Sequence, residues 1–313
     1  MVDNKQSWKA WLYLSPAILL LLVFTVWPII NTVSISLMEG YDMTRAVGGQ
    51  TFKFGLDNFK QVIGYKDFVK CLGNTLLLCV LTVPLSTFLA LLIAVCLNAI
   101  KPLQRLLQTI FFLPYVTNSI AIGMVFSAMF SMVGTNFGGD AQVMITPGII
   151  NTIIESFGGT PINWMNTGSS YFANIVVMVF YIVWNALPFK ILILLGGLQS
   201  VNKQYYDAAK VDGTSRVRVF TKITVPLLSP MLAYVIITGF IGGFKEYTSI
   251  VGVFGNEMGP AGDKNRLNTM VGYIYEALQG NQGRASAAAL ILFAIIFVVT
   301  MINLYVSKKK THY

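Results

Sequence analysis

Residues 74–97 read NTLLLCVLTVPLSTFLALLIAVCL and carry no charge. A helix needs about 20 mostly apolar residues to cross the hydrocarbon core of a bilayer, so this segment is long enough to span a membrane. With this segment, the candidate spans are Trp11–Leu37, Asn74–Leu97, Thr109–Met132, Phe172–Leu198, Leu227–Val251 and Ala285–Ser307. The sequence therefore predicts an all-α integral membrane protein with six transmembrane helices.

The composition of the whole chain agrees with this prediction. The 313 residues are 55% hydrophobic and 11% charged, with a mean hydropathy of +0.66, whereas a soluble domain carries about 25% charged residues. A single His and three Cys leave little for a metal site or a disulfide framework. We therefore expect no metal, and we interpret the cysteines as apolar packing residues.

The charges of the loops predict the orientation, because six spans put both termini on one side. The basic residues on that side are Lys5, Lys9, Lys101, Arg105, Lys203, Lys210, Arg216, Arg218, Lys222 and Lys308 to Lys310, against Asp3, Asp207 and Asp212. The opposite loops hold most of the acidic residues, and Val133–Tyr171 contains no Lys or Arg. By the positive-inside rule, both termini are cytoplasmic. This asymmetry accounts for the net charge of +9 without nucleic-acid binding.

The expected organisation has three parts. They are a cytoplasmic N-terminus at 1–10, a transmembrane domain at 11–307 with a cytoplasmic loop at 199–226, and a basic cytoplasmic tail at 308–313. The first apolar segment follows two lysines, as a signal peptide does. It is longer than the apolar region of a signal peptide, so we expect an uncleaved first span.

The cytoplasmic loop between the fourth and fifth spans reads QSVNKQYYDAAKVDGTSRVRVFTKITVP. We expect a helix over Tyr205–Val211, with a Lys203–Asp207 pair across one turn. Gly213 suits the left-handed position that ends a helix, and Thr214 or Ser215 can cap a second helix that runs to Val225. The result is a basic helix–turn–helix projection. Its shape suits docking to a cytoplasmic protein, and its charge also suits contact with anionic lipid headgroups.

This loop resembles the cytoplasmic signature of bacterial ABC importer permeases, which is Glu-Ala-Ala, three residues, Gly, nine residues and Ile-x-Leu-Pro. The matching positions are Asp207, Ala208, Ala209, Gly213, Ile223, Val225 and Pro226, with Asp207 in place of Glu and Val225 in place of Leu. The resemblance implies the type I ABC importer permease fold. It also implies that the loop is a coupling helix seated in a cleft of a separate ATPase.

Further segments resemble the carbohydrate branch of this family, the maltose and glycerol-phosphate type. Among them are FGLDNFKQVI at 54–63, FFLPYVTNSIAIGMVF at 111–126, GTPINWMN at 159–166 and KITVPLLSP at 222–230. The resemblance implies a multi-pass permease of a bacterial inner membrane that imports an oligosaccharide or related polyol. The implied partners are a second, homologous permease, two ATPase subunits and an extracellular binding protein. The chain has no Walker-type sequence, so we expect no cofactor here, with ATP and Mg bound by the ATPase and no enzyme activity in this chain.

Polar and aromatic residues inside the spans are candidates for contact with the substrate, because polar groups in a bilayer are costly. The candidates are Asn118, Trp184, Asn185, Gly243, Glu246 and Tyr247. Each also has a structural interpretation. The two asparagines can hydrogen-bond to neighbouring helices, Trp184 can pack, and Glu246 can lie at the outer rim. We expect Lys190 to extend toward the cytoplasmic interface.

Three other functions stay open from the residues alone. An ABC permease for a non-sugar solute has the same architecture. An ion-coupled secondary transporter needs carboxylates or a His relay within the membrane, and Glu246 is the acidic residue well inside a span. A membrane enzyme needs a clustered nucleophile and base or a set of metal ligands, and the sequence offers no such cluster.

Overall fold

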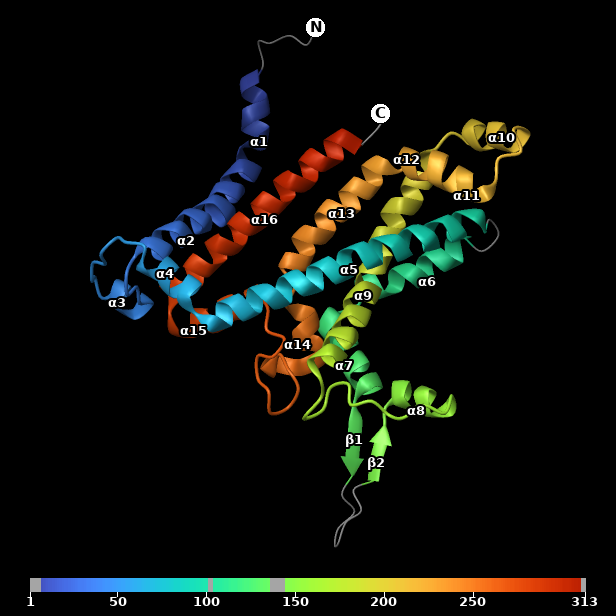
Figure 1. The fold of residues 1–313 in the computed structure, drawn as a ribbon. Coiled ribbons are helices and arrows are strands. Elements are labelled where there is room, and N and C mark those ends of the chain that lie inside the picture. The colour runs from blue at the N-terminus through green and yellow to red at the C-terminus, as the bar shows by residue number, and fades with distance from the viewer. Residues whose placement is uncertain (1–6, 101–103, 136–143, 311–313) are drawn as a thin grey trace. The chain divides into compact units, whose positions relative to one another are not determined.

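The computed structural model describes residues 7–100, 104–135 and 144–310 (Figure 1). The charges that we assigned at Asp3, Lys5, Lys101 and Asp140, and the end of the tail, lie outside these residues. Among the described residues, four of the expected spans are helices long and apolar enough to cross a membrane: Trp8–Leu37, Lys66–Ala99 (α5), Tyr171–Ser200 (α9) and Gln282–Lys308. The last belongs to α16 (Gln282–Lys310).

The third expected span is not one helix. It consists of α6 (Gln104–Val116) and α7 (Ser119–Phe130), whose axes differ by 97°. The chain becomes extended at Asn118, whose side-chain oxygen accepts hydrogen bonds from the N–H groups of Ile120 at 2.9 Å and Ala121 at 3.3 Å. The expected third span is therefore a bent pair of helices, with a residue that suits the N-cap of a helix at the bend.

The fifth expected span is also divided. A helical segment at Arg216–Leu227 meets α13 (Ser229–Phe244) at 68°, and α14 (Thr248–Phe254) follows after a break at residues 245–247. The first segment comprises α11 (Arg216–Val219), a π-helical turn over Phe220–Thr224 and α12 (Val225–Leu227). If each bent pair is one span, the described residues hold up to six spans.

The chain divides into two compact units, and each is described by itself. The first comprises residues 1–69 and 272–294, and the second residues 70–271 and 295–313. The first unit includes α1 (Ser7–Leu21), a π-helical turn over Leu22–Val26, α2 (Trp27–Leu37), α3 (Met43–Val47) and α4 (Asp57–Gly64). The amide of Asn58, which is buried, donates to the carbonyls of Ser36 and Met38 and so holds α4 against the end of α2.

The second unit has two apolar cores along α5 and α9. One includes Leu78 on α5 and residues 175–182 of α9. The other includes residues 90–97 of α5 and residues 191–198 of α9. We call the two ends of this unit the α10 end, after the helix that follows α9, and the α14 end; Figure 1 shows them at opposite ends of α9. Between the two cores, α5 carries the buried polar residues Thr82, Ser86 and Thr87.

The connection between α7 and α9 lies at the α14 end. It contains an antiparallel hairpin of β1 (Met132–Thr135) and β2 (Met144–Pro147), in which Met132 pairs with Pro147, followed by α8 (Ile149–Ser156). The sequence did not predict this hairpin. Ser131 is the C-cap residue of α7, and β1 begins at the next residue, Met132.

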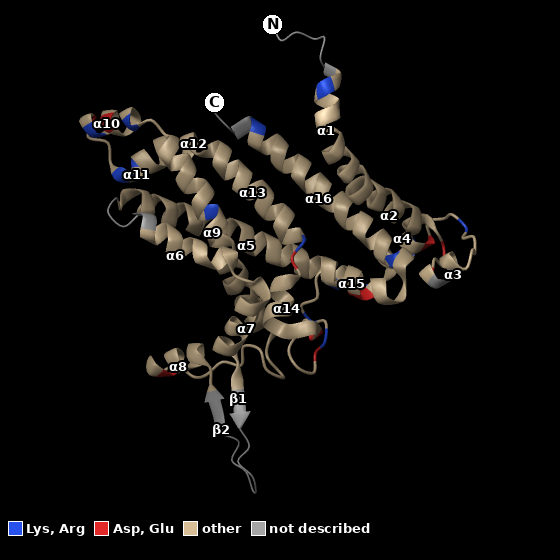
Figure 2. Ribbon diagram, turned by 180° about the vertical axis from the view of Figure 1, so that it is seen from behind, with Lys and Arg blue, Asp and Glu red and all other residues tan. Residues whose placement is uncertain are grey.

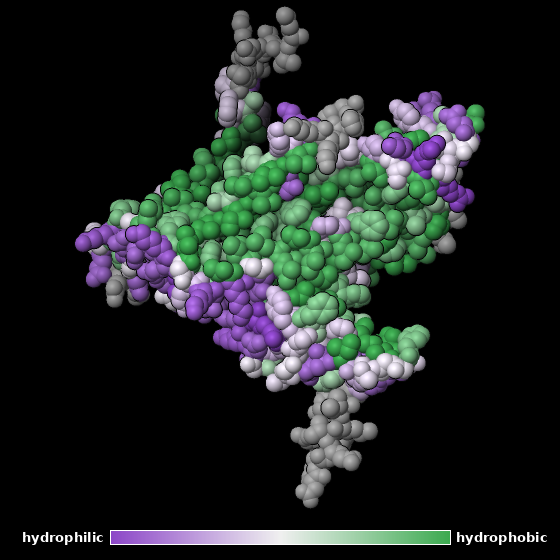
Figure 3. All heavy atoms as spheres, viewed as in Figure 1, coloured by the Kyte–Doolittle hydropathy of each residue, from purple (hydrophilic) through white to green (hydrophobic). Residues whose placement is uncertain are grey.

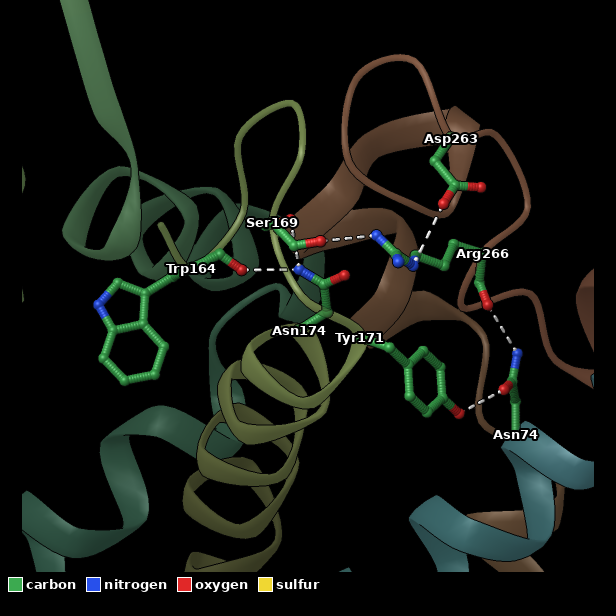
Figure 4. Close-up of polar contacts among 7 residues, drawn as sticks. All are labelled: Asn74, Trp164, Ser169, Tyr171, Asn174, Asp263 and Arg266. Atoms are coloured by element: carbon green, nitrogen blue, oxygen red, sulfur yellow. Dashed lines mark hydrogen bonds and ion pairs between the residues drawn. The ribbon is translucent and has the colours of Figure 1, made fainter. Parts of the chain in front are cut away.

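A hydrogen-bonded network joins the loops at the α14 end to the spans (Figure 4). Arg266 donates to the carbonyl of Ser169 at 2.8 Å and pairs with Asp263 at 3.2 Å. Asn74 on α5 donates to the carbonyl of Arg266 at 3.1 Å and accepts from the hydroxyl of Tyr171 at 2.7 Å. The loop before α9 and the loop after α14 are therefore tied to each other and to α5.

A short helix completes the chain between that loop and α16. This helix is α15 (Met270–Gly280), and the backbone N–H of its first residue donates to the hydroxyl of Thr75 at 3.0 Å. Because Thr75 lies on α5, this bond joins the start of α15 to the same span that Asn74 joins to the loop.

Candidate functional site

A cavity of about 290 Å³ lies in the second unit, in the layer between the two apolar cores. Its lining residues come from α5, α6, α9 and α13 and the start of the break after α13: Thr82, Val83, Ser86, Tyr115, Ile182, Asn185, Ala186, Phe189, Lys190, Thr238, Gly239, Gly242, Gly243 and Glu246. Asn185 lies midway along the Tyr171–Ser200 helix. If this helix spans a bilayer, the cavity lies near the centre of the membrane.

The cavity has a polar wall built around Lys190. This side chain is only 4% exposed, and its ammonium group donates to Ser86 Oγ at 2.7 Å, Thr87 Oγ1 at 2.9 Å and the carbonyl of Val83 at 3.2 Å. An ammonium group has three N–H donors, so α5 satisfies all of them with neutral oxygens. The cation therefore joins α9 to α5 within the cavity wall.

The predicted orientation of the Lys190 side chain is wrong. We expected its side chain to extend toward an interface, whereas it is buried between helices because hydroxyl groups of α5 replace water around the charge. The sequence signal for this burial was the set of hydroxyl residues in TVPLST at 82–87 of α5. Helix periodicity alone does not indicate which neighbouring helix these hydroxyl groups face.

The cavity also has an aromatic wall. The rings of Tyr115 on α6 and Phe189 on α9 stack with centroids 5.8 Å apart and planes 20° apart. Tyr234 of α13 lies next to Phe189, with a centroid distance of 6.5 Å. Sequence reasoning did not select Tyr115 or Phe189, because only the packing of α6 against α9 brings the two rings together.

Three of the predicted substrate residues line the cavity: Asn185, Gly243 and Glu246. A Cβ atom on Gly243 would lie 2.8 Å from the sulfur of Cys79 on α5, so the absence of a side chain permits close packing there. The carboxylate of Glu246 accepts a hydrogen bond from the backbone N–H of Ser249 at 3.2 Å, and its carbonyl accepts from the hydroxyl of Thr269 at 2.7 Å. Glu246 thus supports the break between α13 and α14 as well as the cavity wall.

The other three predicted substrate residues are not among the lining residues. Asn118 caps α7, as described above. Trp184 packs against the first apolar core, and its ring lies 5.2 Å from that of Phe126. Tyr247 also packs against that core. The packing interpretation describes the contacts of Trp184, whereas Asn118 bonds to the backbone of the helix that it caps, α7.

The loop at 199–226 forms a projection at the α10 end. Helix α10 (Lys203–Val211) begins at Asn202, whose side chain caps it, and ends in a turn at Gly213, which has a φ of +61°. The N–H of Gly213 donates to the carbonyl of Lys210 and that of Thr214 to the carbonyl of Ala209, the bond pattern of a Schellman motif. Ser215 then caps α11. The predicted helix, turn and second cap are confirmed.

One detail of the projection differs from expectation. Asp207 pairs with Lys210 at 3.7 Å rather than with Lys203, and both partners are exposed to solvent. Of the two alanines of the signature, Ala208 is exposed, while Ala209 is buried within the chain. Ile223 and Pro226 are half-buried at the base of the projection.

The surface of the projection combines positive charge with exposed apolar side chains. Figure 2 shows basic residues on α10 and α11. The exposed apolar residues are Tyr205 at 54%, Val211 at 88% and Val217 at 74%. Apolar residues exposed beside charges are typical of a surface that contacts another protein.

Two helices long and apolar enough to span a membrane, α5 and α9, line the cavity together with α6 and α13. The whole chain has the fold of an ABC importer permease: a chain in the crystal structure of a bacterial ABC transporter involved in the import of the acidic polysaccharide alginate matches with a TM-score of 0.77. The identity is 20%, and the match covers 99% of this chain and 98% of that chain.

The family described as binding-protein-dependent transport system inner membrane component matches residues 83–312. The arabinooligosaccharides transport system permease protein AraP of Bacillus subtilis is 30% identical, over 95% of this chain and 88% of AraP. The trehalose/maltose transport system permease protein MalF of Thermococcus litoralis is 28% identical, over 97% of this chain and 95% of MalF. The chain belongs to this family and is a multi-pass protein of the inner membrane.

Proposed function

We propose that this chain is the permease subunit of an ATP-driven importer for an oligosaccharide or related polyol. The observation that carries the proposal is the cavity at mid-span, with stacked rings on one wall and hydrogen-bonding groups on the other. A sugar ring has apolar C–H faces that suit the rings of Tyr115 and Phe189. Its hydroxyl groups suit the amide of Asn185, the hydroxyl of Thr238 and the carboxylate of Glu246.

The relatives support a carbohydrate. Their names refer to arabinooligosaccharides, to trehalose and maltose and, for LacF of Rhizobium radiobacter, to lactose. The bacterial alginate transporter was crystallised with a pentasaccharide-bound periplasmic protein. We infer that this chain likewise receives its substrate from a binding protein and shares the pathway with a second permease.

In this proposal, both termini and the α10 end face the cytoplasm. The projection, including Asp207, Ala208, Ala209 and Gly213, docks to one of two partner ATPases, which bind ATP and Mg. Closure of the ATPases moves the projection, and the movement reaches the cavity through α9 and through the helical segment from α11 to α13. The open space around Gly213 gives this docking a sharp test, because, apart from the two adjacent residues, a Cβ atom there meets no described atom within 4 Å.

The docking test uses Gly213→Asn. Asparagine tolerates the left-handed conformation better than most residues, so the variant preserves the turn, and a loss of binding points to a partner that approaches the Gly213 backbone. The membrane complex is purified in mild detergent, and the proteins that co-purify are identified by mass spectrometry. We expect an ATPase and a second permease with the wild type, and strongly reduced ATPase with Gly213→Asn. A wild-type chain that purifies with no ATPase would contradict the proposal.

The cavity test compares two phenylalanines of α9. Phe189 lines the cavity, whereas Phe172 is 77% exposed at the far end of the same helix and does not. Uptake of radiolabelled oligosaccharides is measured in cells that carry Phe189→Ala, Asn185→Leu or the control Phe172→Ala. We expect uptake to fall at least about tenfold for the first two, since one lost contact of about 1.4 kcal/mol is a tenfold effect. Equal uptake by all three variants would exclude this cavity as the substrate site.

A further inference from the structure

Helix α8 begins where the spans end. The N–H of Gly148, its N-cap residue, donates to the carbonyl of Ser131 at 2.9 Å, and Ser131 is the C-cap residue of α7. Figure 1 shows α8 running crosswise to α9, near the N-terminal end of that span. The helix therefore lies at the level at which the chain leaves the apolar layer.

One side of α8 is an exposed apolar stripe. Ile149, Ile153 and Phe157 follow one another at intervals of four residues, which puts them on one face of the helix. Their exposed fractions are 60%, 48% and 87%. Figure 3 shows strongly apolar surface on α8.

The orientation of this stripe is held by Asn151, which is 1% exposed. Its amide donates to the carbonyl of Ile162 at 2.9 Å, and its oxygen accepts from the N–H of Ile162 at 3.1 Å and the indole N–H of Trp164 at 3.0 Å. Trp164 in turn stacks edge-on against Phe130 at the end of α7. These contacts clamp one side of α8 to the unit, so the stripe cannot turn inward.

The stripe itself carries no charge, as insertion among acyl chains requires. Glu155 lies two residues from Ile153 and from Phe157, so it is on another side of the helix, where it is exposed. Phe172, the second residue of the α9 span, is also exposed at this end. Helices with one apolar face and one polar face lie in the plane of a membrane surface, and aromatic side chains gather at that depth.

We propose that α8 lies in the lipid interface at the α14 end, with Ile149, Ile153 and Phe157 inserted among the acyl chains. The side of the helix that carries Glu155 then faces water. The helix holds the loop that follows it at a set height above the bilayer. Through Asn151 and Trp164, it transmits this position to the network around Asn174, which donates to the Trp164 carbonyl at 2.7 Å (Figure 4).

The test is site-directed spin labelling of the full chain in its purified membrane assembly. The labelled variants are Ile149→Cys, Ile153→Cys and Phe157→Cys, with Glu155→Cys as the control on the side of α8 away from the stripe. Cys96, which is exposed, is first replaced by Ser, and this background without a new cysteine measures residual labelling. The assembly is reconstituted in vesicles of phosphatidylethanolamine and phosphatidylglycerol. Collision rates with oxygen and with a water-soluble nickel chelate are then measured.

We expect the ratio of oxygen to nickel collisions to be several-fold higher on the stripe than at Glu155. Equally high nickel collisions at all four sites would mean that the stripe faces water, and the proposal would be wrong. Low collision rates with both reagents on the stripe would mean that a protein partner covers it, which would also overturn the proposal. Folding of each variant is checked by the retention of the assembly in size-exclusion chromatography.

Discussion

The residue that most distinguishes the cavity is Lys190, a buried cation held by neutral oxygens alone. Burying a charge is costly unless hydrogen bonds satisfy it, and here two hydroxyl groups and one carbonyl do so. The hydroxyls of Ser86 and Thr87 donate their own protons back to α5, to the carbonyls of Thr82 and Val83. Their lone pairs are thus free to accept from the ammonium group. Two adjacent hydroxyl residues in one span make the burial possible.

This arrangement predicts that removing an acceptor destabilises the chain more than removing the cation. Ser86→Ala leaves one ammonium N–H without its partner, at a cost of about 1.5–3 kcal/mol for a bond to a charged group. Lys190→Met keeps a side chain of similar length and leaves no charge to satisfy. Thermal unfolding in detergent, followed by fluorescence, should show the lower melting temperature for Ser86→Ala.

The control for this prediction is Ser34→Ala. Ser34 makes the same kind of bond within its helix, to the carbonyl of Ile30, but holds no cation. Its replacement should change the melting temperature little. If Lys190→Met were the more destabilised variant, the ammonium group would be a net source of stability rather than a charge that is merely tolerated.

At the scale of elements, the crossing of α7 and α14 depends on two glycines. A Cβ atom on Gly123 would lie 2.6 Å from the backbone carbon of Gly252, and backbone atoms cannot move aside as a flexible side chain can. The close approach lets the short helix α14 pack against the bent half of the third span. Small residues serve this purpose at helix contacts within membranes.

We therefore predict that Gly123→Ala destabilises the chain by about 1–3 kcal/mol, the usual range for overpacking. The matched control is Gly73→Ala in α5, where a Cβ atom meets nothing within 4 Å and the helix should gain slightly. Chemical denaturation in detergent measures both. An equal stability for the two variants would show that α7 and α14 can separate without cost.

At the scale of the whole molecule, the proposal places the α8 and α10 regions on opposite sides of the membrane. Thr152 on α8 and Val211 on α10 are both exposed to solvent, so cysteines at these positions should react readily. We predict that a membrane-impermeant maleimide labels Thr152→Cys in intact spheroplasts and labels Val211→Cys only after permeabilisation. The reverse result would invert the topology, and with it the assignment of the ATPase docking surface. Labelling is performed with Cys96 replaced by Ser.

Local properties of the sequence determined where the spans lie, how the turn after α10 is formed and which family the chain belongs to. Runs without charge predicted where spans lie, because a bilayer excludes unpaired charge, and four of them are single long helices. The left-handed turn at Gly213 followed from its place after a helical segment, since glycine adopts positive φ without steric cost. The spacing of the loop signature indicated the family, which the comparison over residues 83–312 confirms.

Tertiary structure alone decided which residues face one another. At the break before α14, the carbonyl of Glu246 accepts a hydrogen bond from the hydroxyl of Thr269, a residue of a distant loop. The aromatic wall of the cavity consists of Tyr115 and Phe189 rather than Trp184 and Tyr247, because the packing of α6 on α9 selects the rings. Lys190 is buried because two hydroxyl groups on another helix lie within reach. Hydropathy is a property of each segment, whereas these contacts depend on the relative rotation of helices that are far apart in the chain.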